Sequence, residues 1–314
     1  MSASTKKARY SITNWKAYNE SLVQRGSITF WFDDEAVKNW EHLNQESKVG
    51  RPFTYSDAAI ECALVIRELF RLPYRQTEGL VRSLVDLMEL PITVPDYTSL
   101  AKRAAKLQIV LSVIPRKGSI DVVIDSTGLK VFGDGEWKVR QHGASKRRTW
   151  RKLHLSVDPK TREILAETLT ENSGHDSQQV ADVLDPIERP IKSCAGDGAY
   201  DTWAVYKYLE RRGIAPLIPP KKNAKVKRNG NSKLPPLPRD EAIRGIRDQG
   251  RKAWKRQVGY HRRSLAETTM FRYKTIFGDT LKNRKLPNQK TEARLRCKIL
   301  NRMTQHGLPQ FKWN

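Results

Sequence analysis

The order of strands and helices expected between residues 120 and 219 constrains the fold of this 314-residue chain more than any other feature. Short β-branched runs with a period of two are separated first by turns and then by segments whose apolar residues recur at helical spacing. We expect strands at 120–125, 152–158, 163–170, 191–197 and 215–219, and helices at 177–187 and 202–212. A hairpin turn joins the second strand to the third. This order predicts a mixed five-stranded sheet with flanking helices, in the α+β or α/β class.

Three acidic residues stand where this architecture would bring them together. Asp125 closes the first expected strand and is followed by small residues, and Asp197 closes the fourth with a glycine on each side. Glycine permits a sharp turn and the close approach of a ligand. Glu267 belongs to a helix that follows the last strand. The ribonuclease-H-like fold has the same order of elements: three strands, a helix, a strand, a helix, a strand and then a helix that carries a carboxylate. We therefore predict that fold and treat the trio as candidate metal ligands.

A second pattern surrounds Glu267. Tyr260, Arg263, Glu267 and Lys274 fall on one stripe if residues 260–274 form a helix that turns about 100° per residue. The stripe places one carboxylate among cations, which suits a site where Glu267 holds a divalent metal and Arg263 and Lys274 bind the phosphates of a strand. A surface helix with an internal ion pair explains the same spacing equally well.

The spacing of this stripe resembles a known signature. Tyrosine, arginine, glutamate and lysine separated by two, three and six residues are similar to the signature of the bacterial insertion-sequence DDE transposases of families four and five. Residues 124–138, 148–154 and 264–267 resemble the family-five group, and the resemblance extends over nearly the whole chain. It implies metal-dependent cleavage and transfer of DNA strands, with Asp125, Asp197 and Glu267 as the catalytic metal ligands.

The resemblance also implies the cofactor and the partners. Two Mg²⁺ ions, which Mn²⁺ can replace, would be held by the three carboxylates and would activate first a water and then a 3′-hydroxyl for attack on phosphate. Arg263 and Lys274 would hold phosphates, and Tyr260 would lie against the backbone near the cleaved bond. The expected partners are double-stranded DNA with the terminal inverted repeats, and target DNA. Since two ends must be joined, we expect at least a homodimer.

Composition independently favours a polyanionic partner. The chain has 58 Lys and Arg against 34 Asp and Glu, a formal net charge of +24, and proteins this basic usually bind nucleic acid. No run approaches the roughly 20 apolar residues that span a bilayer, and the N-terminus lacks the apolar core of a signal peptide. We therefore expect a cytoplasmic, nucleoid-associated protein with no membrane partner.

Two basic stretches are candidate DNA-binding surfaces. Residues 138–152 contain no acid, and they supply the candidate contacts Lys138, Arg147, Arg148 and Arg151. Residues 219–263 are also strongly basic, and their prolines and glycines predict that 219–259 is a mobile, poorly ordered insertion that becomes ordered on DNA. A solvated loop that serves only solubility is the alternative for the first stretch.

The first 112 residues predict a helical domain ahead of a catalytic domain at 113–314. Apolar patterns indicate helices at 52–70, 76–90 and 99–107. The third has Leu100, Ala104 and Leu107 on one side, Thr98 as its expected cap, and three outward cations that we expect to bind DNA, namely Lys102, Arg103 and Lys106. These features predict a helix-turn-helix-like module that recognises the terminal repeats. A purely structural helical domain explains them almost as well.

Other acids and the cysteines have simpler explanations. Asp33, Asp34 and Glu35 are adjacent, so they cannot converge on one metal pair, and they suit a helix N-terminus. Turn, cap or strand-start positions are expected for Asp121, Asp134, Asp158 and Asp201. The three cysteines are far apart and are expected to be buried thiols.

Two other functions share part of this pattern. A nuclease or resolvase of the ribonuclease-H-like fold would have the metal site but would lack the domain that recognises element ends. A transposon-derived, sequence-specific DNA-binding repressor would keep the basic surfaces without needing the carboxylates. The intact trio argues against the repressor.

Overall fold

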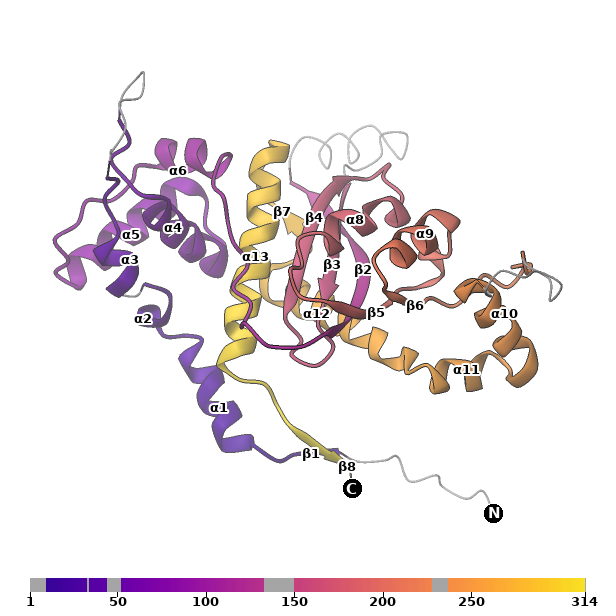
Figure 1. Ribbon diagram of the computed structural model, residues 1–314. Coiled ribbons are helices and arrows are strands. Elements are labelled where there is room, and N and C mark those ends of the chain that lie inside the picture. Colours follow the sequence, from indigo (N-terminus) through magenta and orange to yellow (C-terminus); the bar gives the residue numbers. More distant parts are fainter. Residues whose placement is uncertain (1–9, 33, 44–51, 133–149, 228–236, 314) are drawn as a thin grey trace, which may run out of the picture.

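The computed structural model describes residues 10–32, 34–43, 52–132, 150–227 and 237–313. A central sheet has helices on both faces, and a group of N-terminal helices lies beyond the long C-terminal helix α13 (Leu286–His306) (Figure 1). The short strands β1 (Tyr10–Ile12) and β8 (Phe311–Trp313) pair in antiparallel fashion, so the two described ends of the chain lie together.

The sheet has the predicted mixed topology. Its main strands are β2 (Ile120–Val131), β3 (Trp150–Val157), β4 (Ile164–Glu171), β5 (Ile191–Ala195) and β6 (Ala215–Leu217). They lie in the order β4-β3-β2-β5-β6, with β3 antiparallel to both of its neighbours and with β5 parallel to β2 and β6. This arrangement confirms the ribonuclease-H-like fold.

Two features of β2 differ from the expectation. The strand does not end at Asp125 but continues to Val131, because β3 pairs with it along its whole second half. A sixth strand, β7 (Thr280–Leu281), pairs with Lys130 and Val131 at the C-terminal end of β2. It lies on the same edge of β2 as β5, which pairs with the N-terminal end. Two residues are too short a run to predict as a strand from sequence. Among the described residues, the stretch of β2 around Asp125 therefore has no strand neighbour on that edge.

Alternation along β2 separates the two faces of the sheet. Val122 and Ile124 belong to a buried cluster with α8 (Val180–Leu184) and α9 (Trp203–Arg211). Val123 and Leu129 point the other way and belong to the cluster that includes α12 (Ser264–Phe277) and α13. Since side chains alternate along a strand, Asp125 shares the face of Val123 and therefore lies on the α12 side.

The N-terminal helices largely follow the predicted pattern. They are α1 (Trp15–Gln24), α2 (Ile28–Trp31), α3 (Asp34–Lys38), α4 (Asp57–Phe70), α5 (Tyr74–Leu87) and α6 (Tyr97–Ala104). Leu100, Ala104 and Leu107 are buried as expected. The predicted cap is wrong: Asp96, not Thr98, accepts hydrogen bonds from the backbone of the first turn of α6, at 2.8 and 3.0 Å. A carboxylate one residue before the helix reaches these N–H groups directly.

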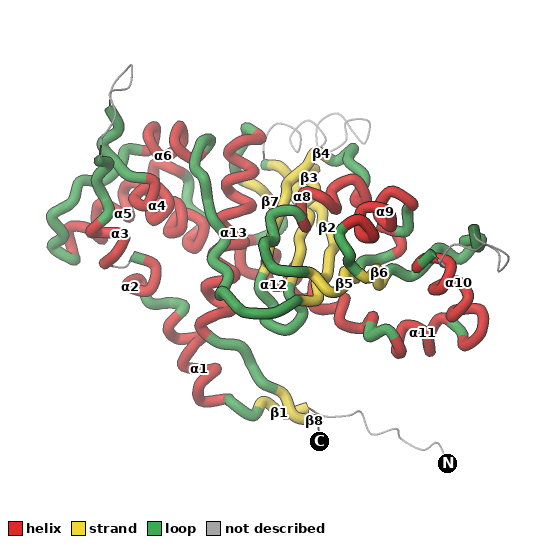
Figure 2. Tube along the Cα trace, viewed as in Figure 1, coloured by secondary structure: helices red, strands yellow, loops and turns green. Residues whose placement is uncertain are grey.

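Helix α13 joins the N-terminal helices to the sheet, and it lies between them in the tube view (Figure 2). Thr291 donates a hydrogen bond to the Ala104 carbonyl at 2.6 Å. On the other side, the Asn301 amide exchanges two hydrogen bonds with the backbone of Ile164, both at 2.8 Å. One buried hydrophobic cluster includes residues of α4, α13 and the sheet, so the two parts of the chain share a core.

The predicted poorly ordered insertion is wrong for the part that the structure describes after residue 236. That part forms α10 (Pro238–Gln249) and α11 (Arg251–Gln257), which meet at Gly250 with a φ of 82°. Proline suits the first turn of α10 because its missing N–H would have no helical partner there. Ile243 and Trp254 are buried, and Arg239 forms two hydrogen bonds with the buried Asp201, at 2.6 and 3.0 Å. These contacts offset the mutual repulsion of the basic residues.

The three cysteines are free and buried, as predicted. Among the described residues, no helix is both long and apolar enough to cross a membrane.

A buried ionic cluster connects α4 to α13. The Arg296 guanidinium contacts the Glu68 carboxylate at 2.7 Å and also contacts Glu292, and all three side chains are almost fully buried. Burial raises the pKa of Glu68, although Arg296 opposes the shift. Removing Arg296 would leave Glu292 without an ion-pair partner among the described residues and Glu68 with Arg67 alone. Breaking such a buried cluster is far more costly than losing a surface ion pair.

We predict that Arg296→Ala lowers the free energy of unfolding by about 3–5 kcal/mol, because it uncovers buried charge. The matched control is Arg82→Ala, which removes an exposed pair with Glu78 on α5 and should cost about 0.5 kcal/mol or less. Chemical denaturation of both variants measures the difference. Equal losses would show that the Arg296 cluster does not hold the two parts of the chain together.

Candidate active site

The register between β2 and β5 places two of the predicted carboxylates side by side. The last parallel pair is Val123 with Ala195. Asp125 follows Val123 by two residues, and Asp197 follows Ala195 by two. Both side chains are therefore expected to project from the sheet toward α12 at the same level. The Asp197 carboxylate accepts a hydrogen bond from the Ala199 backbone at 2.8 Å, which fixes the turn after β5.

The glycine before Asp197 has a packing role. A Cβ on Gly196 would lie 2.9 Å from the Tyr200 ring and 3.2 Å from Ile124. The backbone after β5 must therefore pass close to β2, which keeps Asp197 near Asp125. We expected this glycine to permit a sharp turn and the close approach of a ligand, and the structure shows that it also permits close packing inside the protein.

The predicted stripe forms, but not on one continuous α-helix. Tyr260–Arg263 is a 3-10 turn, η3, that leads directly into α12. Within it, Arg263 donates a hydrogen bond to the Tyr260 hydroxyl at 3.0 Å and forms an ion pair with Glu267 at 2.7 Å. Lys274 follows Glu267 by about two helical turns on the same side. The tighter turn does not change which residues share the stripe.

Arg263 connects the stripe to the sheet. Its guanidinium lies 3.5 Å from the Asp125 carboxylate and 2.7 Å from that of Glu267. It is therefore the cation between the strand carboxylate and the helix carboxylate. Burial by itself lowers the pKa of Arg263, but Asp125, Tyr260 and Glu267 outweigh this effect and the net shift is upward.

Asp125 is the electrostatically costly member of the trio. Burial raises its pKa, and the nearby charges of Asp197 and Glu267 raise it further. A backbone hydrogen bond from Ser126 and the charge of Arg263 oppose the increase without cancelling it. Three carboxylates that share one guanidinium retain excess negative charge, and this environment favours binding of an additional cation.

The donor set fits a hard divalent cation, because all three candidate ligands are carboxylate oxygens. Among the described residues, however, no three acidic, histidine or cysteine side chains form a closed metal-binding group. Arg263 accounts for this arrangement: its guanidinium already lies between Asp125 and Glu267.

The other candidate DNA contacts lie in different environments. Lys102 and Lys106 are exposed. Arg103, in contrast, donates to the Tyr55 carbonyl at 2.8 Å, pairs with Asp57 and lies over the Phe53 ring, so it is engaged within the N-terminal helices. Arg151 donates to Gln289 of α13 at 3.0 Å. Lys138, Arg147 and Arg148 lie outside the described residues.

The remaining acids are separate from the trio. Asp121 accepts from Ser193 at 2.6 Å and pairs with Arg262 at 2.7 Å. Asp158 accepts from the backbone of the hairpin turn, as predicted. Asp201 binds Arg239, and Thr202 caps α9 in its place. The pairing of Arg262 with Asp121 and of Arg239 with Asp201 was not predicted, because no local pattern links residues so far apart in the chain.

Comparison with known proteins gives two matches to family models. Residues 116–302 match a model described as a transposase DDE domain, and residues 23–134 match a second model with the same description. Among solved structures, the chain is similar to the piggyBac transposase in a cryo-EM synaptic complex with hairpin DNA. The identity is 11% and the TM-score 0.39, over 94% of this chain and 76% of that one.

We predict that Asp125→Asn raises the melting temperature in metal-free buffer at pH 7.5. Burial and the neighbouring carboxylates disfavour the charged form of Asp125, which higher pH favours, and asparagine removes that cost. The advantage should shrink as pH falls through the raised pKa of Asp125, because protonation then removes the same cost from the wild type. Thermal unfolding across pH 4–8 measures it.

The control is Asp121→Asn on the same strand, which loses an ion pair with Arg262 and should not raise the melting temperature. A lower melting temperature for Asp125→Asn than for the wild type at pH 7.5 would contradict the electrostatic account.

Proposed function

The chain belongs to the transposases with a DDE domain, since one model of that family matches residues 116–302, and on this premise we propose that Asp125, Asp197 and Glu267 are its catalytic metal ligands. The protein is a DNA transposase, an enzyme whose family depends on divalent metal ions. We also assign its signature, Tyr260 to Lys274, to the family-five group.

One observation carries the assignment of the site. Asp125 and Asp197 follow the last parallel pair of β2 and β5 at equal distance along each strand. Glu267 lies on α12 and forms an ion pair with Arg263, whose guanidinium also lies near the Asp125 carboxylate. Three acids from three separate elements thus face one position at the strand ends, where phosphodiester chemistry needs oxygen ligands.

We propose Mg²⁺ as the metal, with two ions per site and with Mn²⁺ able to substitute. When bound, these ions would supply Lewis-acid activation of the attacking oxygen and the phosphate. The three carboxylates would contribute the ligand oxygens. Asp121 and Asp201 are paired with Arg262 and Arg239, so they are not proposed as ligands. Metal binding would relieve the cost of the Asp125 charge, because burial raises the pKa of that carboxyl even with Arg263 nearby.

We propose phosphate binding as the role of Arg263 and Lys274 once the carboxylates hold metal. In the part of the chain that the structure describes, the Arg263 guanidinium contacts Tyr260 and two of the acids that a metal would neutralise. Its planar guanidinium suits bidentate contact with phosphate. Tyr260 would then lie against the strand backbone near the cleaved bond, because it precedes Arg263 in the same turn.

We propose that the substrate is double-stranded DNA with the terminal inverted repeats, and that strand transfer into target DNA follows cleavage. Lys102 and Lys106 on α6 are the exposed candidates for contact with the repeat. Arg103 has a supporting role, because its contacts fix α6 against residues 53–57. Joining two ends requires two active sites, so we propose a homodimer on DNA.

We predict that Asp125→Ala, Asp197→Ala and Glu267→Ala each reduce cleavage of a duplex bearing the element's own ends by at least about 100-fold, the scale of losing one essential charge-stabilising group. Cleavage is followed with labelled DNA and Mg²⁺. Binding of the same duplex without metal should stay within about threefold, because the carboxylates do not contact phosphate directly.

Asp121→Ala is the matched control, since it removes a carboxylate from the same strand and face without touching the trio. It should keep at least about one-third of the activity. Full cleavage by any trio variant would remove that residue from the site, and loss of DNA binding in all three variants would assign them to binding instead.

A further inference from the structure

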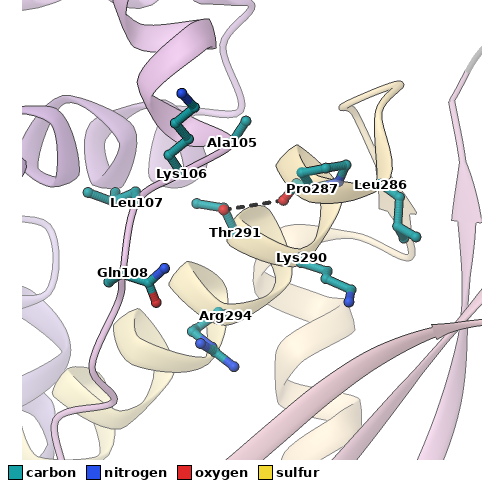
Figure 3. A pocket seen from close by; sticks show the side chains of 9 residues that line it. All are labelled: Ala105, Lys106, Leu107, Gln108, Leu286, Pro287, Lys290, Thr291 and Arg294. Carbon is teal, nitrogen blue, oxygen red and sulfur yellow. Dashed lines mark hydrogen bonds between the residues drawn. The ribbon is translucent and has the colours of Figure 1, made fainter. Parts of the chain in front are cut away.

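Two adjoining hollows lie where the N-terminal helices meet α13. The first has a volume of about 350 Å³ and lies between the end of α6 and the first turns of α13, as the close view shows (Figure 3). The second, of about 650 Å³, lies between α6 and the segment that precedes α13. Ala105 and Lys106 line both hollows. We call the combined surface the α6–α13 seam.

The seam is strongly cationic. Its lining residues include no aspartate or glutamate. Arg103 and Arg294 are ion-paired with Asp57 and Glu167, which lie outside the lining. Within the described residues, the remaining cations of the lining have no ion-pair partner: Lys102, Lys106, Arg284, Lys285 and Lys290. Lys290 interacts with Glu167 only at longer range, beyond ion-pair distance. A concave surface with five cations that lack a close acidic partner favours a polyanionic ligand.

The walls of the seam are fixed rather than adaptable. Asn288 and Thr291 of α13 donate to the Ala101 and Ala104 carbonyls of α6, at 2.9 and 2.6 Å. The segment before α13 is held by the Asn283 backbone, whose carbonyl accepts from Gln289 at 2.9 Å. Because the backbone that carries these cations is held in place, a ligand of matching shape can bind without rearranging the two elements.

The seam is also close to the proposed active site. Strand β7 leads into it, and β7 pairs with β2 at Lys130, five residues after Asp125. Chain geometry therefore limits the separation of Asp125 and Arg284 to about 35 Å, roughly one turn of B-form DNA. A duplex bound at the carboxylates would therefore need to extend by no more than about one helical turn to reach the seam.

We infer that the α6–α13 seam binds the phosphate backbone of the duplex that enters the active site, so that α6 and α13 grip one DNA molecule together. The inference rests on the proposed function. It adds Arg284, Lys285 and Lys290, from the C-terminal part of the chain, to a surface that sequence assigned to the N-terminal helices alone. The fixed spacing of the two elements would then set the distance between the bound repeat and the cleaved bond.

The double variant Lys285→Ala/Lys290→Ala in the full chain tests the inference through the salt dependence of DNA binding. Because each lost phosphate contact lowers the slope of log K against log salt by about 0.9, the slope should fall by about 1.8. The matched control is Lys192→Ala/Lys207→Ala, which removes two exposed lysines from β5 and α9. Its slope should equal that of the wild type.

An unchanged slope in the seam variant, with unchanged thermal stability, would overturn the inference. A change seen only with an RNA duplex would overturn it as well. The measurement is made without divalent metal, so it does not depend on cleavage. Failure of the carboxylate assignment would appear instead as active trio variants with a normal salt slope.

Cross-linking gives a second, positional test. The three native cysteines are buried, so Lys290→Cys provides an accessible thiol for a photoactivatable group. Cross-links should form at one backbone position within about 10 base pairs of the cleaved bond. Cross-links scattered along the duplex would show that the seam does not hold DNA in a fixed register.

Discussion

The register of β2 against its neighbours determines where Asp125 lies, and the proposed active site depends on that position. β3 pairs with β2 from Val123 to Lys130, whereas β5 ends opposite Val123 and β7 begins opposite Lys130. Asp125 lies in the interval between β5 and β7, where no described strand pairs with this edge of β2. A shift of one residue would turn Asp125 to the opposite face, toward α8 and α9 and away from Glu267.

Charge balance is the second constraint on the site. Asp125, Asp197 and Glu267 lie near a single guanidinium, that of Arg263. This arrangement stabilises the folded chain only in part, since the pKa of Asp125 remains raised. Metal and phosphate binding would complement each other: the metal compensates the carboxylates and releases Arg263, which can then bind the anionic strand. The three carboxylates and Arg263 would thus contact one another before binding, and would contact metal and phosphate afterwards.

Sequence predicted the elements that local patterns specify and missed those that depend on distant partners. Strand order and the inward face of α6 follow from periodicity, whereas the choice of Asp125, Asp197 and Glu267 rests on their place in that order and on the family resemblance. Helices α10 and α11 were missed because their stability depends on the contact of Arg239 with Asp201 and on the burial of Trp254. Likewise, Arg103 has the spacing of a DNA contact, but Asp57 and Tyr55, which are distant in sequence, engage it. The two-residue strand β7 has no local pattern at all.

The central claim is that Asp125, Asp197 and Glu267 form one metal centre despite the guanidinium between them. Anomalous diffraction from crystals soaked with Mn²⁺ tests this claim most directly, with a DNA duplex bound to engage Arg263. The account predicts anomalous density in contact with all three carboxylates, and its loss in Asp125→Ala crystals. Density elsewhere on the protein, or unchanged density in the variant, would contradict it.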